Sequence, residues 1–115
     1  MKTPIDFMLV FRMPLNPTAP SQNQLVNMHQ LWQKFIYDTA QQKKLVQVSR
    51  LEMDGAYLSK DKTPVSGLYK ENNLAISGYM IVTVHNIDEA IHLAKDCPIL
   101  DMDGIVELRS LLPIK

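Results

Sequence analysis

The sequence predicts an α+β fold in which an antiparallel sheet carries two helices on one face. Three observations support it: an apolar strand opens the chain at Phe7, a long amphipathic segment follows from Ser21, and residues 77–112 contain a complete strand, helix, strand unit. The resulting order, β-α-β then β-α-β, is a duplication of the ferredoxin-like kind. We therefore expect a single domain over residues 1–115.

The first predicted strand covers residues 7–13, where Phe7, Leu9 and Phe11 point to one face and the residues between them to the other. The prolines within residues 14–20 are incompatible with a helix or an interior strand, so a loop is expected there. The strand is therefore followed by a stiff connection to the next element.

A long helix is predicted from Ser21 to about Gln42, because Ser21 and Gln24 have the spacing of a capping box. Apolar or small side chains then recur at helical spacing. They are Leu25, Met28, Leu31, Trp32, Phe35, Ile36 and Thr39. One face of this helix is expected to be buried, and residues 45–51 follow it as a second strand.

The middle of the chain, residues 52–77, predicts a loop-rich hairpin. Asp54-Gly55 is a strong turn dipeptide. Residues 57–58 are a candidate short strand, and residues 65–69 and 74–76 are short pieces suited to pairing at a sheet edge.

The last unit begins with an apolar strand over residues 79–84, opened by Gly78. Asn86 caps a helix whose apolar stripe is Ile87, Ala90, Ile91 and Ala94, and Cys97-Pro98 ends it. A final strand is expected from Ile105 to Leu112.

Composition is that of an ordinary globular domain, with 46% hydrophobic and 21% charged residues. Twelve basic residues balance twelve acidic ones without a Lys/Arg run, so nucleic acid and membrane are not expected as partners. We expect a soluble cytoplasmic protein. The single cysteine, Cys97, and the absence of metal-ligand spacing among the histidines predict no disulfide, no metal site and no cofactor.

Three blocks, GYMIV, NIDEAIHLAKDCPIL and VELRSLL, resemble the C-terminal half of the YCII-related, or DGPF-domain, family. KLVQVSRL and FMLVFR are similar to the second and first strands of that family. The resemblance implies a dimeric α+β barrel, in which two sheets pack face to face, with a cleft between sheet and helices in each subunit. A largely apolar second sheet face would also require such a cover, so we expect a homodimer.

The family motifs are only partly present. The DGPF motif should fall at residues 66–69, where only Gly67 and an aromatic residue match. The helix position that is often His or Trp in the family falls on Trp32, which leaves His29 one turn out of register. The His/Asp pair proposed for some relatives therefore has no counterpart, and we assign no catalytic residue.

Five residues are the candidate pocket: Arg12, His29, Trp32, Arg50 and Tyr79. Each arginine lies in an otherwise apolar strand, where it must find a carboxylate or carbonyl group, or face a cleft and hold an anion. A structural role is the alternative for each residue, such as a half-buried position on the helix flank for His29.

The leading hypothesis is a homodimeric protein that binds a small anionic or aromatic molecule in this cleft. One alternative is a cofactor-free enzyme of the dimeric α+β barrel type, such as an isomerase, eliminase or monooxygenase. Another is a protein-interaction or transcription-associated accessory domain, because YCII-related domains also occur fused to sigma factors.

Overall fold

The structure is a computed structural model that describes residues 3–15 and 21–112. Residues 16–20 of the predicted proline-rich loop lie outside the described residues. The elements along the chain are β1 (Ile5–Pro14), α1 (Gln22–Gln41), β2 (Leu45–Arg50), β3 (Ala56–Tyr57), β4 (Val65–Ser66), β5 (Lys70–Glu71), β6 (Leu74–Val84), α2 (Ile87–Ala94), the 3₁₀ helix η1 (Pro98–Met102) and β7 (Ile105–Ser110).

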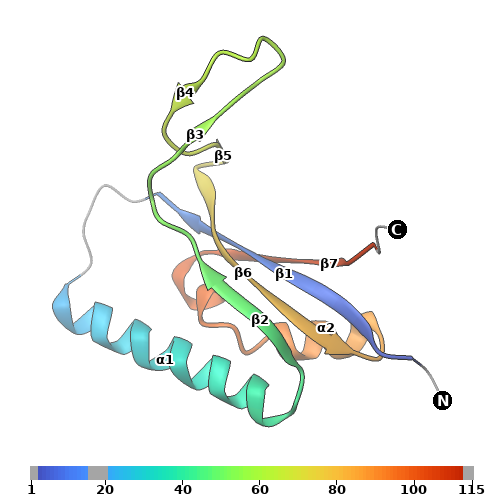
Figure 1. Ribbon diagram of the computed structural model, residues 1–115. Helices are drawn as coiled ribbons and strands as arrows, with labels where there is room; N and C mark the ends of the chain where they lie inside the picture. Colours follow the sequence, from blue (N-terminus) through green and yellow to red (C-terminus); the bar gives the residue numbers. More distant parts are fainter. Residues whose placement is uncertain (1–2, 16–20, 113–115) are drawn as a thin grey trace.

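The main sheet has the strand order β2-β6-β1-β7, and each neighbouring pair is antiparallel. Both helices lie on one side of it (Figure 1). The smallest extent of the Cα trace is 19 Å, which suits one sheet layer and one helix layer. The predicted α+β class with an antiparallel sheet and two helices is confirmed, and the arrangement is compatible with a ferredoxin-like fold.

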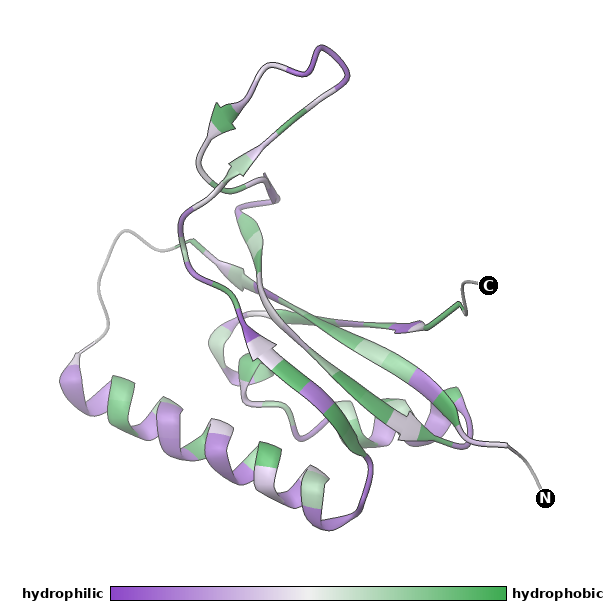
Figure 2. Ribbon diagram, in the orientation of Figure 1, coloured by the Kyte–Doolittle hydropathy of each residue, from purple (hydrophilic) through white to green (hydrophobic). Residues whose placement is uncertain are grey.

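The core lies between the sheet and the helices. The alternation predicted for β1 is confirmed, since Phe7, Leu9 and Phe11 are buried. They share one cluster with β6 residues at alternate positions and with residues of both helices. Figure 2 shows the corresponding change between hydrophobic and hydrophilic stretches along the helices and strands.

Helix α1 begins as predicted, because Ser21 and Gln24 form both hydrogen bonds of the capping box. Its C-terminal half is packed, and Phe35 and Thr39 are buried. The predicted burial of the whole stripe is wrong, because Leu25 and Leu31 are 51% and 47% exposed. A 20-residue helix is about 30 Å long, whereas the six residues of β2, which α1 contacts, span about 20 Å. The helix is therefore longer than the strand beneath it.

The predicted stripe of α2 needs a similar correction. Asn86 caps the helix by accepting a hydrogen bond from the amide of Glu89, at 2.9 Å. The buried residues are Ala90, Leu93 and Ala94, whereas Ile87 and Ile91 are exposed. The helix is therefore rotated so that Leu93 faces the core in place of the two isoleucines. In the described parts of the chain, no helix is long and apolar enough to cross a membrane.

Strand β6 is longer than predicted. Residues 74–76, expected as a separate edge piece, are its first residues, and β5 pairs with them. Asn72 and Asn73 join β5 to β6 with φ of 52° and 62°, as a tight hairpin turn requires. The register passes over Ser77 as a bulge, since Phe11 pairs with Gly78 and Arg12 with Ile76. At the other end of the chain, β7 stops at Ser110 and not at the predicted Leu112.

Two further features are named for use below. The outer face is the side of the sheet opposite the helices. By the strand register it carries Asp6, Met8, Val10, Arg12, Gln47, Ser49, Ile76, Tyr79, Ile81, Thr83, Ile105, Glu107 and Arg109. The arm is residues 52–69, in which β3 and β4 form a two-stranded ladder outside the main sheet (Figure 1). Among the described elements, none covers the outer face.

Candidate functional site

A cleft of about 100 Å³ opens between the sheet and α1. Strands β1, β2 and β6 form one wall, α1 forms the other, and residues just after β2 close one end. Its lining is Phe11, Met13, Trp32, Ile36, Val48, Ser49, Arg50, Leu51, Met53, Ser77 and Gly78. The cleft is thus mainly apolar, and two of the five predicted pocket residues, Trp32 and Arg50, are in its lining.

The aromatic side of the cleft is built around Trp32. Its indole meets Phe11 edge-on at 5.1 Å between ring centroids, and Phe35 at 6.0 Å. Trp32 is only partly buried. Part of its ring surface is therefore free to contact a ligand, while the two phenylalanine rings hold its orientation.

Gly78 gives the cleft a backbone floor. This glycine pairs with Phe11 on one side and with Arg50 on the other. A Cβ atom here would lie 2.7 Å from the carbonyl oxygen of Ser49. Only glycine therefore lets β2 and β6 approach this closely beneath Trp32.

Among the described residues, Arg50 is the one charged residue in the lining of the cleft. It ends β2 with an exposed side chain, and within the described residues it makes no ion pair. A guanidinium group offers paired donors that match a carboxylate or phosphate. The cleft can therefore attract an anion at its rim.

The five predicted pocket residues do not all meet. Trp32 and Arg50 line the cleft together, whereas His29 is exposed on α1 and outside the lining. Arg12 lies on the outer face, where its Nη1 donates to Oε1 of Glu107 at 2.6 Å. Tyr79 is also on the outer face, and its hydroxyl accepts from Nε2 of Gln47 at 2.8 Å.

Strand alternation explains this separation. Arg12 and Tyr79 each follow a residue that lines the cleft, Phe11 and Gly78, so their side chains point to the opposite face. The alternation already visible in residues 7–12 placed Arg12 opposite Phe11. Met13 and Met53 were not predicted as lining residues. Met13 continues the Phe11 alternation, whereas no local signal marks Met53.

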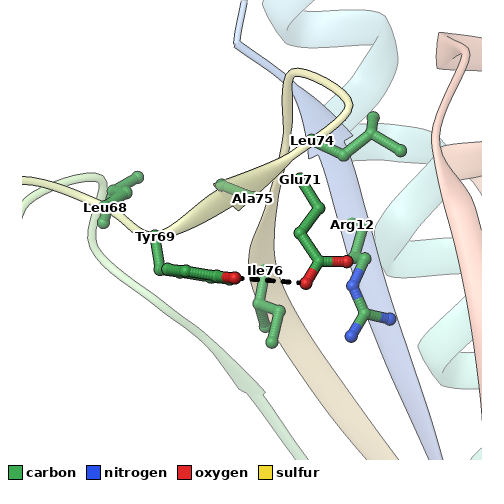
Figure 3. Close-up of a pocket in the computed structure, with 7 residues that line it drawn as sticks. All are labelled: Arg12, Leu68, Tyr69, Glu71, Leu74, Ala75 and Ile76. Carbon is green, nitrogen blue, oxygen red and sulfur yellow. Dashed lines mark hydrogen bonds between the residues drawn. The ribbon is translucent and has the colours of Figure 1, made fainter. Parts of the chain in front are cut away.

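A second cavity, the corner cavity, has a volume of about 230 Å³ and lies where the arm meets the outer face (Figure 3). Leu68 and Tyr69 of the arm line it together with Arg12 and Ile76 of the outer face. The Tyr69 hydroxyl donates to Oε1 of Glu71 at 3.3 Å, as Figure 3 shows. Two of the positions compared with the DGPF motif, residues 68 and 69, are therefore at this corner and not in the cleft.

A third hollow of about 380 Å³ lies between α1 and α2. Its two lysines pair with carboxylates: Lys34 Nζ lies 2.7 Å from Oδ2 of Asp38, and Lys44 Nζ lies 3.1 Å from Oε1 of Glu89. His92, predicted to face solvent, is exposed at its rim. Asp96 and Asp101 of its lining make no ion pair within the described residues, so the unpaired charges of this hollow are acidic, whereas the unpaired charge of the cleft is the guanidinium of Arg50.

Two titratable groups outside the cleft have strongly shifted pKa values, and each shift has a structural cause. The amide of His85 and the ammonium group of Lys44 hydrogen-bond to Glu89 and lower the pKa of its carboxyl to about 2. Cys97 is buried at the end of α2, as predicted, and this burial raises the pKa of its thiol to about 12. Within the described residues, no group of three or more His, Cys, Asp or Glu side chains is placed to hold a metal ion.

The fold and the cleft define a two-layer α+β domain with an apolar pocket that has the guanidinium group of Arg50 at its rim. No protein-family model matches the sequence, and no curated protein matches it. The resemblance to the YCII-related family therefore stays a prediction from the sequence blocks.

Proposed function

We propose that the protein is a homodimer that binds a small organic anion with a flat apolar body, such as an aromatic carboxylate, in the cleft. The observation that carries this proposal is the combination of an exposed part of Trp32 with Arg50. The indole offers an apolar plane, and the guanidinium offers two donors to a carboxylate.

The size of the cleft restricts the ligand. A dry cavity of about 150 Å³ accommodates benzene, so a cleft of about 100 Å³ takes one ring, part of which stays outside. Met13 and Met53 border this space with flexible thioether side chains, which adapt to different ring shapes. The ligand is therefore a single-ring acid and not a large cofactor.

Binding is favoured over acid–base catalysis by the residue types in the cleft. Its described lining contains no His, Asp, Glu, Cys or Lys. A general acid or base must lie within hydrogen-bond reach of the reacting atom. His29, the nearest of the predicted candidates along the helix, is not part of the lining. We therefore propose a ligand-binding role for this cleft.

The homodimer is supported by the outer face. Met8, Val10 and Ile81 lie at its centre, while Ile76 and Ile105 remain 42% and 48% exposed. The charged groups in its midst are paired within the chain, since Glu107 contacts both arginines of this face. An apolar surface with internally paired charges suits burial against a second copy. We propose that two sheets pack through this face as a dimeric α+β barrel, and that the chain is a divergent YCII-related protein.

The binding proposal is testable through Trp32, which is the only tryptophan in the chain. Its fluorescence is followed during titration with benzoate, phenylacetate and the uncharged analogue benzamide. We expect both acids to change the emission in the millimolar range and benzamide to bind more weakly. An exposed ion pair contributes up to about 1 kcal/mol, so Arg50→Gln should weaken benzoate binding by up to about fivefold and leave benzamide unaffected.

The matched control is Lys95→Gln, which also removes one positive charge but lies outside the lining of the cleft. It should leave both affinities unchanged. Equal binding of benzoate and benzamide by the unmodified protein, or no emission change with either acid, would refute the proposed ligand class.

A further inference from the structure

The arm has too few contacts to be stable in isolation. Its strands are two residues each, and Tyr57 meets Tyr69 edge-on at 5.5 Å between ring centroids. Leu58 and Val65 are 64% and 40% exposed. A lone two-stranded hairpin is marginally stable in water unless another surface covers its apolar side chains. The exposed leucine and valine therefore call for a partner surface.

The position of the arm indicates which surface this is. Leu68 and Tyr69 at its base line the corner cavity with Arg12 and Ile76, and both of the latter belong to the outer face. Figure 3 shows Tyr69 and Ile76 on the same side of the strands. The arm thus rises on the side of the sheet that the second copy would cover, and it stands clear of the helices (Figure 1).

The size of the outer face gives the second argument. The four strands are about 4.8 Å apart, and the six residues of β2 and of β7 limit their common paired length to about 20 Å, so they present a face of about 400 Å². A standard stable interface covers about 800 Å² on each partner. The outer face alone is smaller than this, and the adjoining arm is the apolar surface that extends it.

We propose that the arm of each copy packs against the other copy and forms the second half of the dimer interface. This inference rests on the homodimer of the proposed function. By two-fold symmetry the contact is made twice, and each corner cavity receives side chains of the other copy. The occupant is a second copy because the arm and the outer face form one continuous surface through Ile76 and Tyr69.

Residues 56–66, the outer part of the arm, can be removed without altering the main sheet. The amide of Gly67 donates to the carbonyl oxygen of Gly55 at 2.8 Å, and β3 and β4 pair only with each other. Replacing residues 56–66 by Asn-Gly makes Gly55 and Gly67 the ends of a two-residue hairpin turn, closed by that same hydrogen bond. The sheet, the helices and the cleft keep all their residues in this variant.

Analytical ultracentrifugation over a range of concentrations measures the dimer dissociation constant of each variant. We expect the intact chain to form a dimer and removal of residues 56–66 to weaken it at least tenfold. Leu58→Asp, at a 64% exposed position, should also weaken it. The control is Leu100→Ser, which removes an exposed leucine from η1 on the helix side of the sheet and should have no effect.

The outcomes separate the two proposals. A monomeric intact chain refutes the homodimer and this inference together. A dimer whose dissociation constant is unchanged by removal of residues 56–66 refutes the inference and leaves the homodimer standing. Circular dichroism checks that the shortened chain is folded. If it is not, the full-length Leu58→Asp variant decides, and an unchanged dissociation constant overturns the role of the arm.

Discussion

Replacing Gly78 by alanine tests how closely the strands beneath the cleft must approach. In the structure the new Cβ would lie 2.7 Å from the carbonyl oxygen of Ser49 and 3.4 Å from the Cα of Arg50. Both are backbone atoms, so no side-chain rotation relieves the contact. An ordinary contact begins at 3.4 Å, so β2 must move away from β6 by about 0.7 Å.

The cost follows from two opposing effects. Overpacking a well-ordered interior costs about 1–3 kcal/mol. Alanine is favoured over glycine inside a strand by roughly 0.5–1 kcal/mol, because the unfolded chain then loses less entropy on folding. The two ranges leave a net loss of about 0–2.5 kcal/mol, so the free energy of unfolding of Gly78→Ala should fall by about 1 kcal/mol, the middle of that range. Since β2 carries Arg50, the variant should also bind benzoate more weakly.

Urea unfolding followed by circular dichroism measures the first effect, and Trp32 fluorescence measures the second. Gly55→Ala is the matched control, because its nearest neighbour is a leucine methyl group at 3.8 Å, an ordinary contact. It should change stability by less than about 0.5 kcal/mol. If Gly78→Ala is as stable as the unmodified protein, the close approach of β2 and β6 is not what requires glycine.

Three further predictions concern the core and its charged edge. Hydrogen bonds to the carboxylate of Glu89 lower its pKa from 4.5 to about 2. These bonds therefore stabilise the fold above pH 4.5, and this contribution is lost as the pH falls toward 2. Glu89→Gln should consequently flatten the dependence of the urea midpoint on pH between these two values. A slope equal to that of the unmodified protein would contradict this. The thiol of Cys97, with its pKa raised to about 12 by burial, should not react with a disulfide reagent at pH 8 until urea unfolds the chain; rapid native reaction would contradict its burial. Ile99→Ala should lower the free energy of unfolding by about 2–5 kcal/mol, because this side chain is fully buried, and a loss under 1 kcal/mol would show that the site collapses around the smaller residue.

The features that the sequence predicted well depend on local chemistry. The capping box of Ser21, the Asn86 cap and the alternation of Phe7, Leu9 and Phe11 each require only residues close in the chain. The same alternation places Arg12 on the sheet face opposite the cleft. Glu107, with which Arg12 forms an ion pair, lies 95 positions away in the sequence. A pattern could indicate that the guanidinium needs a carboxylate, but only the strand order shows which carboxylate it finds.

The features that were missed depend on the extent of a neighbouring surface. Periodicity correctly showed which side of α1 is apolar, yet two of its leucines are exposed. Leu25 lies in the N-terminal part of the helix, which is longer than the adjoining strand β2, and Leu31 borders the hollow between α1 and α2. In α2 the sequence spacing predicts that Ile87 and Ile91 face the core, but in the structure Leu93 is buried and the two isoleucines are exposed. In α1 the sequence defines the apolar side, and tertiary packing decides how much of it is covered; in α2 tertiary packing also decides which side faces the core.

The bulge at Ser77 shifts the alternation of side chains along β6 by one residue. On its N-terminal side, Ala75 points inward and is 3% exposed, whereas Ile76 points outward and is 42% exposed. Without Ser77 the two side chains would exchange sides, and an isoleucine would be forced into the space now filled by a methyl group. The hairpin of Asn72 and Asn73 would also turn over. One residue thus sets on which side of the sheet the first side chains of β6 lie, so deleting Ser77 would be far more disruptive than replacing it.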